Sequence, residues 1–122
     1  LFIIIKYLDI FELNQIKKLI LRVMINKTFT PKRTICRVTF SLPGEWADKD
    51  VKLVGDFNDW DEEADSLEKK KDKWEVTMRL KPENRYRFKY LIDGDKWEND
   101  DSADEYVPND FGTEDSVVVV GK

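Results

Sequence analysis

Two tryptophans, Trp60 and Trp97, have the residue type and setting that point most directly to a binding chemistry. Trp60 follows Asn58-Asp59 and Trp97 follows the turn at residues 93–96, so both indoles stand at polar, acidic turns. An exposed indole costs hydration free energy unless something covers it. The C–H face of a pyranose can stack on such a ring while the sugar hydroxyls reach polar neighbours. Two indoles at an angle would suit a curved sugar chain; the alternative is that each ring packs over its own loop.

Histidine is absent from the sequence, and cysteine occurs once. Within this chain that excludes histidine-based nucleophiles and bases, His-ligated zinc, an internal disulfide and a four-thiolate metal site. The carboxylates of residues 98–105 could in principle form a glycosidase pair, but such chemistry needs a deep cleft that a small sandwich has little volume to enclose. Asp93-Gly94-Asp95 lacks the rest of a calcium-loop pattern. We therefore predict a non-enzyme with no catalytic residue, no metal site and no cofactor.

The charge pattern limits the classes of partner. The formal net charge is -4 and no basic face dominates, which argues against nucleic acid as a partner. Charged residues such as Lys6, Asp9 and Lys17 interrupt the apolar N-terminal segment, so no run approaches the roughly 18 apolar residues of a membrane span. The same segment lacks the pattern of a secretory signal. We expect no transmembrane span and a cytoplasmic location.

The N-terminal 25 residues differ in character from the rest of the chain. They contain neither Gly nor Pro and read as a helix. One face of this helix would carry Leu13, Ile16, Ile20 and Val23. A docking helix, a membrane-surface helix and a reading-frame artefact ahead of Met24 are the alternatives. We accordingly divide the chain into an apolar segment, residues 1–26, and a domain formed by residues 27–122.

From Thr34 onward the apolar residues recur with a period of two. The pattern predicts strands with one buried face at residues 36–42, 51–57, 74–80, 86–92 and 116–120. Trp74 is in register with the buried positions of its strand, so we expect it in the core. Turn signals such as Pro43-Gly44 and Asp93-Gly94 separate the strands. Short strands with no intervening helix predict an all-β, antiparallel sandwich.

Several separated blocks then resemble one family, in the right order. They are VKLVGDFNDW at residues 51–60, YRFKYLIDG at 86–94 followed by Trp97, NDFG at 109–112 and SVVVV at 116–120. The sequence resembles the glycogen-binding, isoamylase N-terminal "early set" carbohydrate-binding modules, family forty-eight. These modules occur in glycogen branching and debranching enzymes and in the beta subunit of AMP-activated protein kinase. The resemblance implies an immunoglobulin-like β-sandwich that binds α-1,4-linked glucans without catalysis.

The resemblance also implies which residues bind. The two platform tryptophans of the family match Trp60 and Trp97, although one additional residue precedes Trp97 here. The family's lysine, five residues before the turn glycine, matches Lys89. The apolar residue that braces the glucan matches Phe111, where the kinase modules have leucine.

The remaining matched position is a departure from the family. The asparagine that caps a sugar hydroxyl falls on Asp115, and a carboxylate accepts hydrogen bonds but cannot donate them. Asn58 and Thr113 are expected to add polar contacts. The expected partner is an α-glucan polysaccharide or a maltooligosaccharide, with glycogen-metabolising enzymes or another protein chain as further candidates. The main alternative is a protein-interaction or regulatory module whose glucan site is weakened or lost; a hydrolase is the third class.

Overall fold

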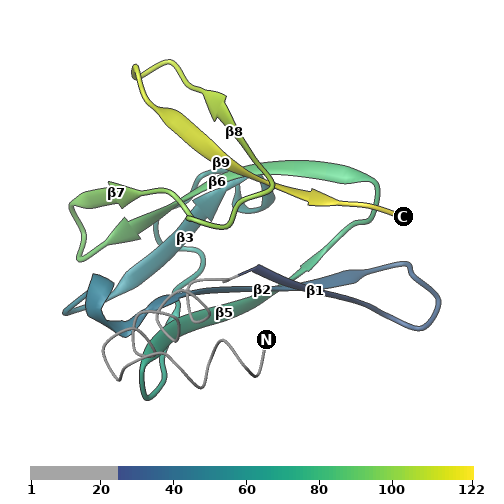
Figure 1. The fold of residues 1–122 in the computed structure, drawn as a ribbon, viewed down its shortest axis with the longest axis horizontal. Helices are drawn as coiled ribbons and strands as arrows, with labels where there is room; N and C mark the ends of the chain where they lie inside the picture. The colour runs from purple at the N-terminus through teal and green to yellow at the C-terminus, as the bar shows by residue number, and fades with distance from the viewer. Residues whose placement is uncertain (1–24) are drawn as a thin grey trace, which may run out of the picture.

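The computed structural model describes residues 25–122, which form two antiparallel β-sheets stacked as layers (Figure 1). The first sheet contains, in spatial order, β1 (Ile25–Phe29), β2 (Cys36–Pro43), β5 (Lys73–Leu80) and β4 (Glu68–Lys69). The second contains β3 (Val51–Gly55), β6 (Asn84–Ile92), β9 (Glu114–Val120) and β8 (Glu105–Pro108), with β7 (Lys96–Glu98) also paired to β6. Two short 3₁₀ turns, η1 (Gly44–Trp46) and η2 (Asp56–Asn58), complete the described elements. The prediction of an all-β antiparallel sandwich is confirmed.

The core lies between the two sheets, where the inward residues of facing strands meet. Phe40 of β2 packs edge-on against Phe88 of β6, with ring centroids 5.0 Å apart. Tyr90, two residues after Phe88, is fully buried and packs against the Phe88 ring. Trp74 is 7% exposed within the same cluster, as its strand register predicts. Burying each such side chain contributes roughly 1.5–3 kcal/mol, so the alternating pattern dictates which face of each strand turns inward.

The structure departs from the strand predictions at the end of β3 and at the start of the domain. The strand predicted for residues 51–57 ends at Gly55, because η2 turns the chain, although Phe57 still packs against Phe40 at 5.8 Å. β1, which the sequence pattern did not indicate, begins at Ile25, two residues before the expected domain boundary. Its alternation is hidden because Lys27 stands between Ile25 and Phe29, where it pairs with Asp104 at 2.6 Å. The helix expected for the preceding segment lies outside the described residues.

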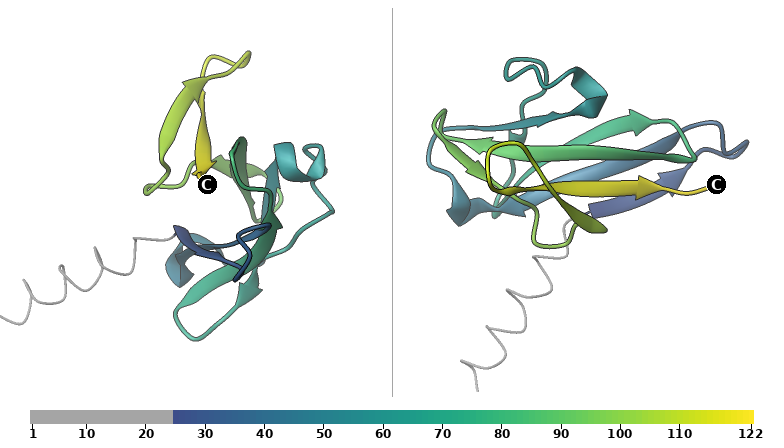
Figure 2. Two further views of the ribbon diagram at one scale, coloured as in Figure 1. Left: turned by 90° about the vertical axis from the view of Figure 1, so that its right-hand side faces the viewer. Right: turned by 90° about the horizontal axis from the view of Figure 1, so that it is seen from above.

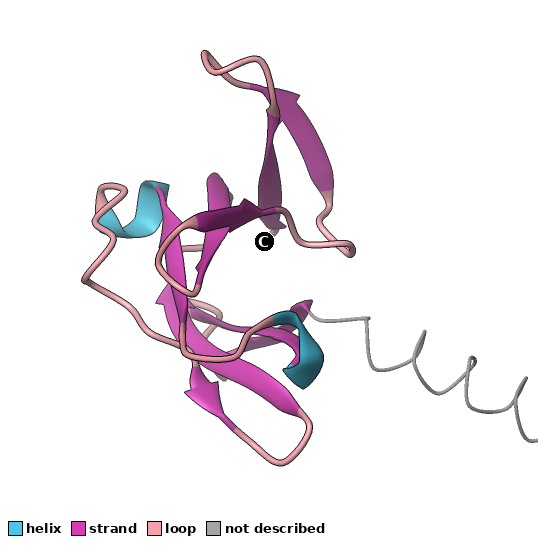
Figure 3. Cartoon of the chain, turned by 90° about the vertical axis from the view of Figure 1, so that its left-hand side faces the viewer, coloured by secondary structure: helices cyan, strands magenta, loops and turns pink. Residues whose placement is uncertain are grey.

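The strands β4, β7 and β8 were also not predicted, since they have two to four residues each and carry no clear alternation. β7 and β8 nevertheless matter for the site, because they place side chains on the second sheet's outer face. Figure 2 shows the strands running lengthwise along the molecule, and Figure 3 shows the β8–β9 hairpin extending beyond the two layers. Among residues 25–122, no helix is long and apolar enough to cross a membrane.

β6 is the central strand of the second sheet. The strands that pair with it determine which side chains lie together on the outer face of the sheet. β3 pairs with one edge of β6, whereas β9 pairs with the first half of the other edge and β7 with the second half. Phe88 and Tyr90 face the core, so Arg87, Lys89 and Leu91 face outward. The antiparallel register then places Trp97 of β7 opposite Leu91. Segments from three parts of the chain are thus brought to one surface.

Candidate functional site

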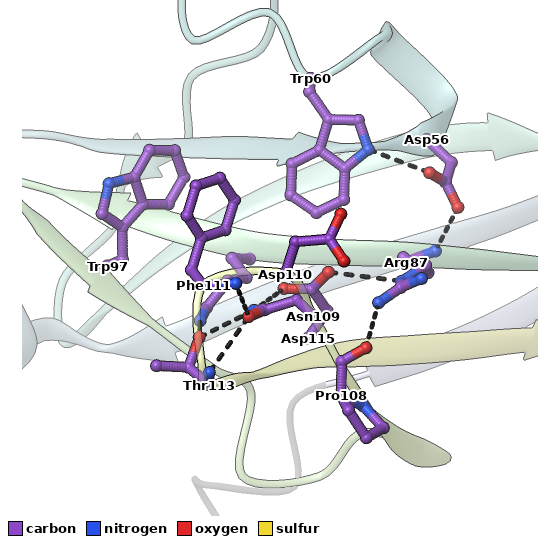
Figure 4. Close-up of a pocket in the computed structure, with 11 residues that line it drawn as sticks. Asp56, Trp60, Arg87, Trp97, Pro108, Asn109, Asp110, Phe111, Thr113 and Asp115 are labelled. Carbon is purple, nitrogen blue, oxygen red and sulfur yellow. Dashed lines mark hydrogen bonds and ion pairs between the residues drawn. The ribbon is translucent and has the colours of Figure 1, made fainter.

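Three aromatic side chains line one cleft on this outer face. Trp60 is 37% exposed, Trp97 is 44% exposed and Phe111 is 90% exposed, so none is part of the core. In the view of Figure 4 the Phe111 ring falls between the two indoles. The cleft has a volume of about 740 Å³. Its remaining lining residues are Asp56, Arg87, Lys89, Pro108, Asn109, Asp110, Thr113 and Asp115.

Trp97 and Lys89 form one half of the cleft. Trp97 reaches it because β7 pairs with the end of β6, opposite Leu91. Lys89 lies two residues before Leu91 on the same face of β6 and is half-buried. Its Nζ donates a hydrogen bond to Thr113 Oγ1 at 3.3 Å. The ammonium has three donors, so this single contact leaves others for a bound molecule.

Trp60 is held in the other half by the turn that follows β3. Its backbone N–H donates to Gly55 O at 2.9 Å, and both Asp59 and Trp60 have left-handed backbone conformations, with φ of 56° and 58°. The indole Nε1 donates to Asp56 Oδ1 at 3.0 Å. Asp56 Oδ2 in turn accepts the backbone N–H of Arg87 at 2.7 Å. The orientation of this indole is therefore coupled to the edge of β6.

The loop between β8 and β9 presents Phe111, and one side chain organises it. Asn109 Oδ1 accepts hydrogen bonds from the backbone N–H groups of Phe111 at 3.0 Å and Thr113 at 3.1 Å. Asn109 Nδ2 donates to Thr113 Oγ1 at 2.7 Å and to Asp115 Oδ1 at 2.8 Å. Gly112 completes the turn with φ of 77°, which a residue with a side chain adopts only with strain. These contacts hold the loop in a conformation that leaves the Phe111 ring exposed to solvent.

Asp115 lines the cleft, but its carboxylate is occupied by the protein. The residue is only 6% exposed. Oδ1 accepts the amide of Asn109, and Oδ2 lies 3.3 Å from Nε of Arg87 in an ion pair. The position where the family carries a sugar-capping asparagine thus holds a charged side chain that supports two neighbours. A direct sugar contact by Asp115 remains a prediction that this geometry does not favour.

Asn58 is the one expected site residue that does not line the cleft. Its Oδ1 accepts the backbone N–H of Gly55 at 3.0 Å. Its Nδ2 donates to Leu53 O at 2.8 Å and to Asp65 Oδ2 at 2.9 Å. The amide therefore stabilises the β3–η2 turn that leads to Trp60, and in this way it supports the cleft without lining it.

Sequence reasoning missed Arg87, Asn109, Asp56 and Asp110, all of which line the cleft. A signal for Arg87 exists: it lies two residues before Lys89 in a strand of clear alternation, so it shares the face of that lysine. Asn109 precedes Asp-Phe-Gly, and asparagine commonly bonds to backbone N–H groups in such turns. Asp56 and Asp110 have no comparable local signal.

A buried carboxylate anchors the segment between β7 and β8. Asp100 is 1% exposed, and Tyr90 donates its hydroxyl to Asp100 Oδ2 at 2.6 Å. Ser116 Oγ accepts the backbone N–H of Asp100 at 3.0 Å. Burial raises the pKa of Asp100 above its ordinary value, although the Tyr90 hydrogen bond opposes the shift. Burial also raises the pKa of Tyr90.

A second carboxylate stabilises the turn that leads into Trp97. Asp93 accepts backbone N–H groups from Asp48, Lys49 and Asp50, the shortest being Lys49 N at 2.7 Å. The hydrogen bonds from Asp48 and Lys49 lower the pKa of Asp93. Across residues 25–122, no group of His, Cys, Asp and Glu side chains is arranged to hold a metal ion.

The fold and the aromatic cleft together indicate a class of protein: a β-sandwich module with an aromatic-lined cleft on the outer face of one sheet. Comparison of the sequence with known protein families identifies this module more closely. Residues 38–122 match the family model described as the glycogen recognition site of AMP-activated protein kinase. The chain belongs to this family of carbohydrate-binding modules, of the family forty-eight type. Comparison with curated proteins gave no significant match.

Family membership confirms the resemblance seen in the sequence, and it supports non-catalytic binding of glycogen or another α-glucan. The family match begins at Val38, within β2, and continues to the last residue, so it covers both exposed tryptophans and the Phe111 loop.

Proposed function

We propose that this protein binds α-1,4-linked glucans by stacking glucose rings on Trp60 and Trp97, with Phe111 bracing the sugar chain between them. The observation that supports this most directly is the meeting of all three exposed rings at one cleft, although they come from different segments of the chain. Scattered exposed aromatics would need no explanation, whereas three around one cleft indicate a binding surface.

Polar groups supply the hydroxyl contacts in this proposal. Lys89 donates to one sugar hydroxyl, and Thr113, whose Oγ1 already accepts from Lys89 and Asn109, donates to another. Stacking contributes on the order of 0.5–1.5 kcal/mol per ring beyond the buried area, taking aromatic pairs as the scale. The hydroxyls lose water on binding, so each hydrogen bond adds only about 1 kcal/mol. We expect a dissociation constant of roughly micromolar to millimolar for a short oligosaccharide, with stronger retention on a polymer that engages several copies.

The central test removes each platform ring. Trp60→Ala and Trp97→Ala should each weaken binding to glycogen at least tenfold, as measured by retardation in native gels containing glycogen. Tyr106 offers a matched control: it is 42% exposed, close to the value for Trp97, but it does not line the cleft. Tyr106→Ala should migrate like the parent. If the parent is retarded and both tryptophan variants migrate with it, the platform assignment fails.

A second test asks whether the cleft distinguishes α-1,4-linked from β-1,4-linked glucose chains. An α-1,4-linked chain curves, whereas a β-1,4-linked chain is extended, and the curved chain is proposed to stack on both indoles as it passes Phe111. Tryptophan fluorescence should therefore shift with maltoheptaose and remain unchanged with cellohexaose. Equal responses to the two sugars would show that the cleft does not distinguish the linkage.

The alternative of a protein-interaction module with a lost glucan site drew its main support from Asp115. Because the Asp115 carboxylate is buried and paired with Arg87, its presence does not indicate a damaged site. A flat titration with every α-glucan, together with a defined protein complex, would favour this alternative.

A further inference from the structure

We propose that Arg87 is a further ligand-binding residue, which donates hydrogen bonds to the glucose unit stacked on Trp60, and that Asp115 positions it. This inference rests on the proposed glucan function. Arg87 lies on the outer face of β6 and lines the same cleft as both indoles. In Figure 4 its guanidinium lies on the Trp60 side, away from Trp97.

The contacts of Arg87 leave part of its guanidinium available. Nη2 donates to Pro108 O at 2.7 Å, and Nε faces Asp115 Oδ2 at 3.3 Å. A guanidinium has five N–H donors. Neither N–H of Nη1 has a hydrogen-bond partner or an ion pair anywhere in residues 25–122. Three donors therefore remain for a ligand, two on Nη1 and the second N–H of Nη2, on a side chain that is 41% exposed.

The guanidinium is also held in place before any ligand arrives. Pro108 is the last residue of β8 and Asp115 lies in β9, so two neighbouring strands fix it at two points. A long side chain that is already ordered loses less conformational entropy when it binds. This pre-organisation favours a role in recognition.

The arrangement gives each platform its own cationic donor. Trp97 stands next to Lys89 through the pairing of β7 with β6. Trp60 is coupled to Arg87 through Asp56, which accepts both the Trp60 indole N–H and the Arg87 backbone N–H. Arg87 and Lys89 lie two residues apart on the same face of β6, so the two cations can serve successive sugars of one chain.

The chemistry of the guanidinium indicates which sugar atoms it would contact. It donates only, and at its outer edge one N–H of Nη1 lies side by side with one N–H of Nη2, so this edge matches two neighbouring acceptor oxygens. In the interior of an α-1,4-glucan the only neighbouring pair of free hydroxyls is that at carbons 2 and 3. We therefore assign Arg87 to this pair on the glucose that covers Trp60.

The role of Asp115 follows from the same geometry. A buried carboxylate holds a guanidinium better than a neutral amide does, because opposite charges attract; the contact here is an ion pair, since Nε of Arg87 has no hydrogen-bond partner among residues 25–122. An asparagine at position 115 would leave Arg87 without its counter-ion. The departure from the family pattern is thus explained by the presence of Arg87.

The experiment measures affinity for β-cyclodextrin, a ring of α-1,4-linked glucose, by calorimetry on the full chain. Arg87→Met should weaken binding about tenfold, since it removes charged donors to hydroxyls. Arg85→Met is the matched control: Arg85 lies two residues earlier on β6, pairs with Glu105 and does not line the cleft. It should bind like the parent. If the parent itself fails to bind, the proposed function is wrong; if it binds and Arg87→Met binds equally well, only this inference is wrong.

A ligand variant tests the assigned hydroxyl pair. β-Cyclodextrin methylated at the 2- and 3-hydroxyls should bind the parent more weakly, and Arg87→Met should add no further loss with it. β-Cyclodextrin methylated only at the 6-hydroxyls should keep the tenfold difference between parent and variant. A tenfold effect of Arg87→Met on the 2,3-methylated ring would contradict the assignment.

Asp115→Asn separates positioning from direct contact. If Asp115 acts through Arg87, Asp115→Asn weakens binding in the parent but has no effect in the Arg87→Met background. A purely structural role would lower affinity equally in both backgrounds, and a direct sugar contact would leave Asp115→Asn at least as tight as the parent. Either of these results overturns the positioning role. Circular dichroism and thermal unfolding of each variant verify that the affinities compare folded proteins.

Discussion

The indole N–H of Trp60 donates a hydrogen bond to Asp56, whose other carboxylate oxygen accepts the backbone N–H of Arg87 on β6. The Trp60 indole is therefore held by the sheet as well as by its own turn. An indole with one fixed polar edge has a restricted set of orientations, so its face is already directed along the cleft when a ligand arrives.

We predict that Asp56→Ala weakens glucan binding by about three- to tenfold without removing any proposed sugar contact, because Trp60 must then be ordered on binding. Titration with maltoheptaose measures the loss. Fluorescence anisotropy decay of Trp60, recorded in variants with the other tryptophans replaced by phenylalanine, should show faster ring motion. Unchanged ring motion together with unchanged affinity would contradict the coupling.

Asn109→Ala should weaken binding at least tenfold through Phe111. The substitution removes four hydrogen bonds that shape the β8–β9 loop, so the exposed ring loses its fixed position. Hydrogen exchange should accelerate at the amides of Phe111 and Thr113 and stay slow at β9 residues such as Val118. Protection that stays unchanged at Phe111 and Thr113 would show that Asn109 does not hold the loop.

Gly55→Ala tests the close approach of the Trp60 turn to β6. A Cβ at this position would lie 2.4 Å from Arg87 O and 2.7 Å from Phe88 Cβ. Both neighbours belong to a central strand and cannot move freely, so we expect a loss of about 1–3 kcal/mol in the free energy of unfolding, measured with urea. Gly121→Ala is the control, because a Cβ there meets nothing within 4 Å. Equal stability of the two variants would refute the steric argument.

The raised pKa of Asp100 predicts a pH dependence of stability. The unfolded chain has an ordinary Asp pKa of about 3.9, and the folded value is higher because of burial. The contribution of Asp100 is fully present below about pH 3.9 and is lost as pH rises through the folded pKa. Urea unfolding from pH 4 to 7 should show parent stability falling relative to Asp100→Asn as pH increases. Parallel curves would mean that Asp100 does not titrate in this way.

Asp93 should behave in the opposite sense. Its pKa is lowered by backbone N–H groups of Asp48 and Lys49, so its contribution is present above about pH 3.9 and is lost as pH falls through the folded pKa. Asp93→Asn tolerates the left-handed backbone at this position, where φ is 52°, and it removes the charge together with one of the two acceptor oxygens. Thermal unfolding should show the variant less stable than the parent at pH 7, with a smaller difference at pH 3. A difference that grows with acidification would be inconsistent with this carboxylate cap.

Much of the fold was accessible from the sequence because its signals are local. A period of two identifies a strand with one buried face, and the buried residues Phe40, Trp74 and Phe88 follow that period. The short strands escaped detection because they have too few residues for a period, and β1 because the paired Lys27 interrupts it. The polar turns before Trp60 and Trp97 left two outcomes open for each indole, exposure or packing over its own loop, and the structure leaves both rings exposed.

The sequence by itself therefore determined the all-β class, the core faces and the family, and with the family the expectation of glucan binding. The tertiary structure decided that Trp60, Trp97 and Phe111 meet at one cleft, that Arg87 joins them and that Asp115 turns toward the protein. These outcomes depend on which strands become neighbours and in what register. Such pairings join residues far apart in the chain, and a local pattern of residue types carries no information about them.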